Sequence, residues 1–288
     1  MGGGRSLDHF VMAVKDLDGS GALYERLGFQ VMPQMRHIEI GTCNRVFQLH
    51  DTYVELLGDI DRAPEPLRSK VAARFGCGEG ITLVSLTSSD LVGDRALLGA
   101  AGLNPAPINN ARRKVLMPEG HFDETDSRCV YTWHEQPSVS LFISQHFKPH
   151  VIWSPAYQLH PNTATRVTGL SYLAAEPGSI KPYFSAMLGV APLREDSGSI
   201  LYRTQHGETV EILRPEALRA RYAGRVPSCA ALRAYGIGLQ VAVAELDSCR
   251  RLLARNNVTS VEVGRGLLVP PEAAAGTVIE FVQETTVA

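Results

Sequence analysis

The chain has 288 residues, of which 44% are hydrophobic and 20% are charged, and its formal net charge is −2. This length suits two domains of about 100–200 residues each, and the composition is that of an ordinary soluble globular protein. The lack of a basic excess argues against a nucleic-acid partner. No apolar run reaches the roughly 18–20 residues of a membrane span, so we expect no membrane partner either.

The cysteines are odd in number, widely spaced and without a Cys-x-x-Cys pair: Cys43, Cys77, Cys129, Cys229 and Cys249. This usage argues against a disulfide framework and against a thiolate zinc site. We therefore expect most of them to be buried free thiols. The first six residues lack the apolar core of a signal peptide, and together these features predict a cytoplasmic protein.

The first structural unit runs from Leu7 to Gly58 and predicts the element order β-α-β-β-β. Residues 7–14 alternate as in a strand whose two faces are both largely covered. Asp16 offers N-cap chemistry to a helix that Gly28 ends. Short strands are predicted to follow at 29–32, 45–49 and 53–57.

The same pattern of helix start and helix end recurs three times further along the chain. In each copy a strand leads to an acidic helix start, and a glycine or asparagine ends the helix about 12 residues later, the spacing expected of repeated units. The four pairs are Asp16 with Gly28, Asp90 with Gly102, Glu176 with Gly189 and Glu245 with Asn257. Four matches indicate four copies of one unit.

The boundary between two pairs of units is predicted at 148–166, where prolines are frequent and apolar periodicity is weak. We therefore expect an N-terminal domain at 1–147, a linker at 148–166 and a C-terminal domain at 167–288. An insertion at 109–127 lengthens the second unit, and no regular structure is predicted for it.

Units of this kind, paired into a curved sheet, resemble the vicinal oxygen chelate superfamily, and this chain is similar to its glyoxalase-like domain proteins. The resemblance covers nearly the whole chain and implies an α+β fold, with four βαβββ modules paired into two cup-shaped glyoxalase-like domains. The stretches that carry it are Leu7-Asp8-His9-Phe10, Asp16-Leu17, Leu27-Gly28-Phe29, His37, residues 41–45, Tyr53-Val54-Glu55-Leu56, His160-Pro161-Asn162 and residues 270–281.

The resemblance also implies a site inside the cup. Enzymes of the superfamily bind a divalent metal there, through His, Gln or Glu on the first and last strands of the units, and the metal chelates vicinal oxygens of the substrate. Members without metal bind small molecules, such as antibiotics, in the same cup.

His9 and Glu55 occupy the first-strand and last-strand positions of the first unit. An imidazole and a carboxylate suit Zn, Ni, Fe or Mn when other coordination positions stay open. Strand alternation predicts that His9 shares one face with Leu7 and Val11. The alternative is a core histidine that bonds a neighbouring carboxylate without metal. The resemblance favours the ligand interpretation.

A third ligand is needed, because catalytic metals generally take about three protein ligands. In the second unit Leu83 stands where a matching histidine would be, and Phe142 or Ile143 replaces the acid. The histidines that could complete the site are His37, His121, His134 and His146. We favour His146, which lies just past the closing strand of that unit.

The second domain has poorer candidates for a site. Glu211 and Glu280 repeat the phase of Glu55, but glycines occupy the matching first-strand positions, Gly169 and Gly238. We expect these glutamates to bond strand or arginine partners and the domain to be mainly structural or to act as a lid.

Substrate contacts are predicted from the middle of the first unit. Gly41 permits a tight turn, and Asn44 and Arg45 would then orient a carbonyl or carboxylate of the substrate, with His37 nearby. The alternative is a hairpin with a solvated arginine. Three strand aromatics, Tyr131, Trp133 and Phe142, are either plain core or walls of the cup. The run Arg112-Arg113-Lys114 is expected to be solvated, with a charged substrate mouth as the alternative.

Two functions follow from these residues. The first is a metal-dependent lyase, isomerase or dioxygenase acting on a small oxygenated substrate in the N-terminal cup, with Glu55 as a metal ligand or as the catalytic base. The second is a metal-free small-molecule-binding protein of the antibiotic-sequestering type. Four units in one chain make a monomer self-sufficient, so a monomer or a homodimer is expected.

Overall fold

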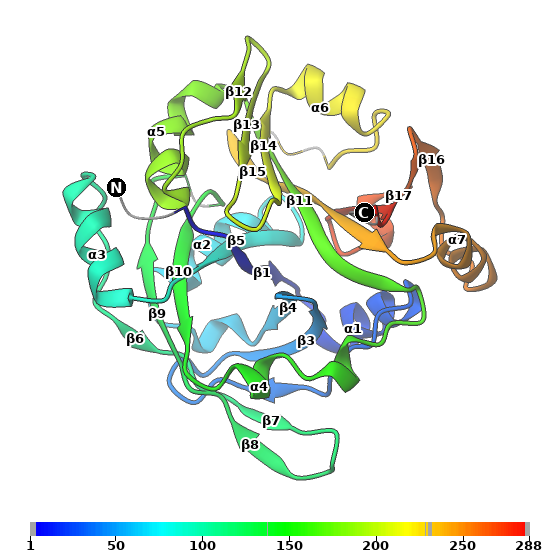
Figure 1. Cartoon of the computed structure of the whole chain (residues 1–288), viewed down its shortest axis with the longest axis horizontal. Helices are drawn as coiled ribbons and strands as arrows, with labels where there is room; N and C mark the ends of the chain where they lie inside the picture. The colour runs from blue at the N-terminus through cyan, green and yellow to red at the C-terminus, as the bar shows by residue number, and fades with distance from the viewer. Residues whose placement is uncertain (1–3, 137, 228, 230–231, 286–288) are drawn as a thin grey trace.

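The computed structural model of the chain describes residues 4–136, 138–227, 229 and 232–285 (Figure 1). The first unit contains β1 (Leu7–Ala13), α1 (Leu17–Arg26), β2 (Met35–Arg36), β3 (Cys43–Leu49) and β4 (Thr52–Gly58). Helix α1 begins where predicted, because the Asp16 carboxylate accepts a hydrogen bond from the Gly19 N–H at 2.9 Å. The strand predicted at 29–32 is wrong: β2 begins past Pro33, which has no N–H to donate to a sheet.

The second unit is longer and holds elements that the sequence pattern did not predict. The turn η1 (Ile60–Arg62) and helix α2 (Leu67–Phe75) precede β5 (Gly80–Thr87) and α3 (Leu91–Ala100). The insertion at 109–127 contains β6 (Asn109–Asn110) and a hairpin of β7 (Lys114–Leu116) and β8 (Phe122–Glu124), which projects from the molecule in Figure 1. Strands β9 (Ser127–Thr132) and β10 (Leu141–His146) complete the unit.

The third and fourth units follow a connection that contains α4 (Pro149–Ile152) and η2 (Pro155–Gln158). The third unit consists of β11 (Ala164–Ala174), α5 (Pro177–Leu188), β12 (Arg194–Glu195), β13 (Ser199–Arg203), β14 (Thr209–Leu213) and α6 (Pro215–Arg221). The fourth consists of β15 (Ala234–Val243), α7 (Leu246–Arg255), β16 (Val261–Val263), β17 (Gly266–Val269), η3 (Pro271–Ala273) and β18 (Val278–Gln283). None of the described helices is long and apolar enough to cross a membrane.

The strands form two curled sheets of eight strands each. Their orders are β2-β3-β4-β1-β5-β10-β9-β6 and β12-β13-β14-β11-β15-β18-β17-β16. In both sheets two copies of a four-strand arrangement meet through a central antiparallel pair, β1 with β5 and β11 with β15. The predicted α+β fold of paired βαβββ modules is confirmed.

In the sequence, the predicted connection at 148–166 follows the last strand of the first sheet and leads to the second sheet. Its last residues already belong to β11, which begins at Ala164. The ends of the chain, residues 1–3 and 286–288, lie outside the described residues.

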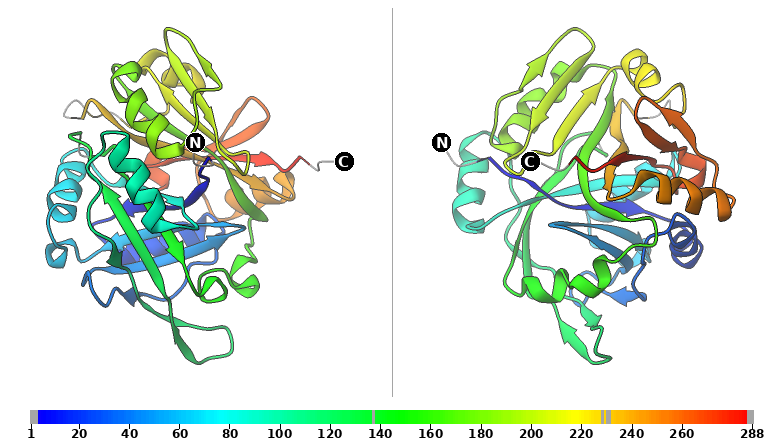
Figure 2. Two further views of the ribbon diagram at one scale, coloured as in Figure 1. Left: turned by 60° about the vertical axis from the view of Figure 1, so that its left-hand side comes forward. Right: turned by 45° about the vertical axis from the view of Figure 1, so that its right-hand side comes forward.

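One face of the first sheet packs against the second sheet, and the other face lines the first cup. Phe10 and Met12 of β1 belong to a core cluster that also contains Leu170 and Tyr172 of β11. Val11, between them in sequence, belongs to a separate cluster inside the first cup. Figure 2 shows the two halves of the chain stacked in this way. Strand alternation therefore separates the residues that hold the halves together from those that can form a site.

His160 ties the connection between the sheets to the first unit. Its Nδ1 accepts a hydrogen bond from the Gln30 N–H at 3.0 Å, and its Nε2 donates to the Gln48 carbonyl oxygen at 2.6 Å. A ring with one accepting and one donating nitrogen is neutral. Burial accordingly lowers the pKa of His160 below its ordinary value.

Stability is expected to fall on mild acidification because of His160. Its folded-state pKa lies below the unfolded value of about 6.5, so its contribution is present above that pH and is lost as the pH falls toward the folded pKa. The free energy of unfolding, measured in urea at about pH 7.5 and about pH 5.5, should fall less between these two pH values for His160→Gln than for the wild type. The same loss in both proteins would contradict this assignment.

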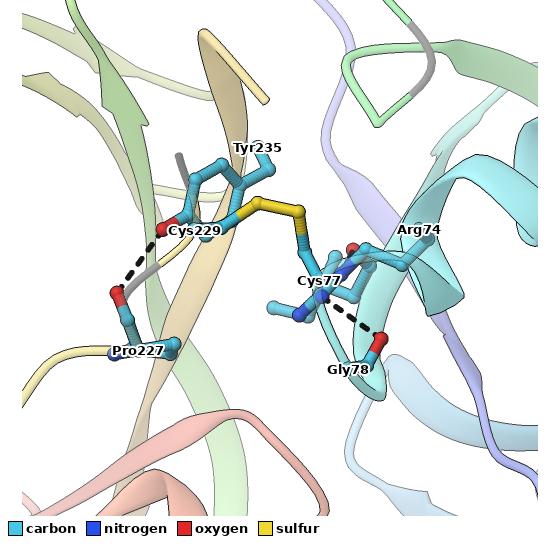
Figure 3. The surroundings of a disulfide bond; sticks show 7 residues. Arg74, Cys77, Gly78, Pro227, Cys229 and Tyr235 are labelled. Carbon is cyan, nitrogen blue, oxygen red and sulfur yellow. Dashed lines mark hydrogen bonds between the residues drawn. A yellow bond between two sulfur atoms is a disulfide. The ribbon is translucent and has the colours of Figure 1, made fainter. Parts of the chain in front are cut away.

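A disulfide joins the two halves, contrary to the expectation from cysteine spacing. Cys77, just after α2, is bonded to Cys229, in the loop before β15, across 152 residues of sequence. Figure 3 shows the bond beside Arg74 and Tyr235, whose ring lies 5.6 Å from the guanidinium carbon of Arg74. Such a distant pair leaves no signal in sequence spacing. The other three cysteines are free and buried, as predicted: Cys43, Cys129 and Cys249.

Candidate metal centre and its pocket

A pocket lies inside the first cup, and its empty volume is about 530 Å³ when the open solvent at its mouth is included. Strands from both units of the first sheet form its walls, so residues far apart in sequence meet there. Four of the predicted site residues line it: His9, His37, Glu55 and His146. The other lining residues include Val11, Ile40, Tyr53, Leu67, Leu83, Arg113, Ser127, Tyr131, Phe142 and Ser144.

An irregularity in β1 brings Asp8 to this site. Leu7 pairs with Leu86 of β5 while His9 pairs with Ser85, so β1 carries one extra residue, Asp8, over this step. A β-bulge of this kind re-aims side chains and is common beside active sites. Leu7 joins the core between the sheets instead of sharing a face with His9, as strict alternation predicted. Asp8 was not identified as a site residue from the sequence, because strict alternation places it on the face opposite to His9.

Asp8, His9 and His146 form a buried group whose potential ligand atoms all lie within 4.8 Å of one another. Nε2 of His146 lies 3.1 Å from each carboxylate oxygen of Asp8, and Nδ1 of His9 also bonds that carboxylate. The Ser127 hydroxyl lies 2.7 Å from the other ring nitrogen of His146. Burial by itself raises the pKa of Asp8, but His146 and His9 outweigh it and hold that pKa well below its ordinary value. The carboxylate is therefore ionised.

Glu55 belongs to a second buried polar group in the same pocket. Its Oε1 accepts a hydrogen bond from the Asn44 amide at 2.8 Å and lies 3.5 Å from Nε2 of His37. The other ring nitrogen of His37 lies 3.0 Å from the Thr42 hydroxyl. Burial by itself raises the pKa of Glu55, but His37 and other nearby groups lower it overall. Glu55 is thus an ionised carboxylate with a fixed orientation.

Asn44 and Arg45 do not act together. Asn44 is fully buried and bonds Glu55, whereas Arg45 donates to the Met32 carbonyl oxygen at 3.2 Å and pairs with Glu25 of α1 at 2.9 Å. Successive side chains of a strand point to opposite faces, so these two cannot both reach one ligand. The structure corrects the predicted role of Arg45, which lies outside the pocket.

In the second unit, apolar residues occupy the positions that correspond to His9 and Glu55 of the first unit. Leu83 and Phe142 both line the pocket, as the alignment of the repeats predicts. His146 reaches the same space because it lies four residues beyond Phe142, on the same face of β10. Neither His121 nor His134 lines the pocket; His121 is exposed, and His134 packs against Tyr183.

Aromatic rings enclose His9 and continue outward. Tyr53 stacks on the His9 ring with centroids 4.3 Å apart, and Phe142 meets it edge-on at 5.1 Å. Tyr131 stacks against Phe142 at 4.9 Å and against Trp133 at 4.8 Å. Tyr131 also lines an adjoining pocket with Trp133, so an aromatic wall leads away from the histidine.

Among the described residues, the second cup contains no group equivalent to Asp8, His9 and His146. Arg221 bonds Glu280 through both carboxylate oxygens, one of them at 3.0 Å, and its Nε lies 3.6 Å from Glu211. At Gly238 an added Cβ would lie 3.0 Å from the Tyr222 hydroxyl, so the space where a ligand side chain would begin is already filled. The two glutamates bond an arginine partner, as predicted.

The chemistry of the Asp8, His9 and His146 donors fits a transition-metal ion. Two imidazoles and one carboxylate, buried beside a pocket, are ligands that Zn, Fe, Mn and Ni accept. The Ser127 contact would fix the ring of His146, which is the usual role of a residue behind a metal-binding histidine. Glu55 is not part of this group and bonds Asn44 instead.

Comparison with solved structures shows similar folds at low sequence identity. A hypothetical protein from Staphylococcus aureus gives a TM-score of 0.67 at 9% identity, over 96% of this chain and 99% of that one. A mutant of 4-hydroxymandelate synthase from Streptomyces coelicolor gives 0.62 at 12% identity, over 98% and 93%. A xylose isomerase-like TIM barrel/4-hydroxyphenylpyruvate dioxygenase fusion protein gives 0.57 at 13% identity, and this chain spans 50% of its length.

No curated protein sequence matches this chain significantly. At identities this low, the similar structures establish the fold alone. The sequence pattern of the glyoxalase-like domain family, in contrast, matches residues 7–188, which is more than half of the chain and includes the whole first cup. This protein therefore belongs to the glyoxalase-like domain family.

Proposed function

We propose that the protein is a metal-dependent glyoxalase-like enzyme, a lyase, isomerase or dioxygenase that acts on a small oxygenated substrate in the first cup. The observation that carries the proposal is the buried group of Asp8, His9 and His146, with ligand atoms within 4.8 Å of one another beside a pocket. The names of two similar structures, a 4-hydroxymandelate synthase and a 4-hydroxyphenylpyruvate dioxygenase fusion, support an enzyme of this kind.

In this proposal Asp8, His9 and His146 hold a divalent ion of Zn, Ni, Fe or Mn. A bound ion would supply Lewis acidity toward an oxygen atom of the substrate. The ionised Glu55 carboxylate takes a proton from the substrate as a general base, and the Asn44 amide holds its Oε1 in place. Tyr53 and Phe142 pack against the His9 ring and limit the access of water to the reacting groups.

Metal analysis tests the proposal directly. We expect the purified protein to contain or tightly bind a transition metal, and a chelator to lower its melting temperature. A ligand present at 100 times its dissociation constant stabilises the folded state by about 2.7 kcal/mol. His9→Ala should abolish both effects, and His121→Ala, at an exposed position outside the pocket, should change neither. The proposal fails if no metal binds and the chelator has no effect on the wild type.

A metal-free small-molecule-binding protein is the second candidate, and one observation favours it. Asp8, His9, His146 and Ser127 already satisfy one another by hydrogen bonding, as in a structural network. A bound small molecule would then raise the melting temperature, and a chelator would leave it unchanged.

A further inference from the structure

Arg113 lies in the wall of the pocket without a salt bridge to any described carboxylate. Its residue is only 5% exposed, and it lines the pocket. Its Nε has no hydrogen-bond partner, and no described carboxylate lies within 4.0 Å of its guanidinium. Its guanidinium carbon lies 5.4 Å from the centroid of the Tyr53 ring, and its charge is close enough to Glu55 to help lower the pKa of that carboxyl.

The neighbouring Arg112 shows what an ordinary arginine does at this place in the chain. Its side chain is 41% exposed and forms ion pairs with Glu39 at 2.6 Å and Glu124 at 3.1 Å. The expectation that this basic run is solvated therefore holds for Arg112. It is wrong for Arg113, whose side chain turns inward.

The backbone fixes Arg113 in this orientation. Its N–H donates to the Thr125 hydroxyl at 3.0 Å, and its carbonyl oxygen accepts from the Thr125 N–H at 3.0 Å. A β-bridge connects it to His37 on the other side. A buried guanidinium that hydrogen-bonds no carboxylate is costly, so a rigidly held one facing a pocket indicates that a hydrogen-bonding anion comes with a ligand.

We propose that Arg113 binds the carboxylate of an anionic substrate, which deepens the function proposed above and rests on the first cup being the substrate pocket. The planar guanidinium matches a carboxylate in a forked, charge-assisted contact. A phosphate dianion fits less well, because Arg113 is the one arginine lining this pocket among the described residues, and Glu55 adds negative charge nearby.

The rest of the ligand is expected to be apolar, and an aromatic ring fits best. From the Arg113 end the pocket continues along Ile40, Leu67 and Tyr131, which also line the adjoining pocket that contains Trp133. Aromatic rings stack favourably on such a wall. The ligand class is therefore a small carboxylate with an apolar or aromatic body.

Phenylacetate and its neutral analogue phenylacetamide test the charge recognition by calorimetric titration of the full-length, chelator-treated protein. We expect the wild type to bind the acid at least about tenfold more tightly than the amide, a difference of about 1.4 kcal/mol. Arg113→Met should remove this preference, Arg113→Lys should keep part of it because the charge remains without the fork, and Arg112→Met should keep it in full.

The melting temperatures of the ligand-free variants provide a second readout. Arg113→Met should unfold close to the melting temperature of the wild type, because the substitution breaks no salt bridge within 4.0 Å to a described carboxylate. The proposal is overturned if the wild type binds acid and amide equally, or binds neither at millimolar concentration. It is also overturned if the preference survives in Arg113→Met or if that variant is destabilised. The titration is done without metal, so it tests Arg113 separately from the metal site. If the protein prefers the acid but binds no metal in any experiment, the proposed enzyme function is refuted and the carboxylate site is not.

Discussion

Asp8→Asn is expected to lower the affinity for a transition metal about 10–100-fold or more, even though both histidines remain. That range is the usual cost of losing a carboxylate behind a metal-binding histidine, and loss of a direct ligand costs at least as much. Asp8 is 1% exposed and bonds both His9 and His146, so its carboxylate sets the positions of both rings. Competition with a chromophoric chelator measures the affinity.

Glu55→Gln is the matched control, because it also replaces a buried carboxylate of the pocket by an amide. In our proposal Glu55 is a base held by Asn44 and not a ligand, so this variant should retain metal affinity. The opposite pattern, with affinity kept in Asp8→Asn and lost in Glu55→Gln, would transfer the carboxylate ligand to Glu55.

Loss of the Cys77–Cys229 disulfide is expected to reduce the free energy of unfolding by about 2–4 kcal/mol. The bond spans 152 residues and connects the end of α2, on the first sheet, to the loop before β15, on the second. A cross-link over so long a segment restricts the unfolded chain strongly. Urea unfolding of the wild type with and without a thiol reductant measures the difference.

The double variant Cys77→Ser/Cys229→Ser controls for effects of the reductant on the rest of the protein. It should unfold at the urea concentration of the reduced wild type, with no response to reductant. The free cysteines Cys43, Cys129 and Cys249 are buried and remain in both proteins. If reductant leaves the wild type unchanged, the bond does not contribute to stability.

The fold, and the cup in which the pocket lies, could be predicted from the sequence alone. Four strand–helix repeats with helix caps such as Asp16 and Asp90 are local features, and each forms the predicted helix start. The repeats also predicted an apolar Leu83, and Phe142 or Ile143, at the matching positions of the second unit, and of these Leu83 and Phe142 line the pocket. Helix caps and the periodic burial of apolar residues depend on residues close together in the sequence, so they can be recognised without a structure.

Which side chains come together depends on the tertiary structure. A bulge against β5 brings Asp8 to His146, a bridge to His37 holds Arg113 in the pocket wall, and Cys77 bonds Cys229 across the two sheets. Arg45, adjacent to Asn44, faces away from the pocket because of strand alternation. Each of these outcomes depends on the pairing of segments far apart in the chain. Sequence spacing carries no record of such pairing, because a one-residue shift in register reverses which face a side chain occupies.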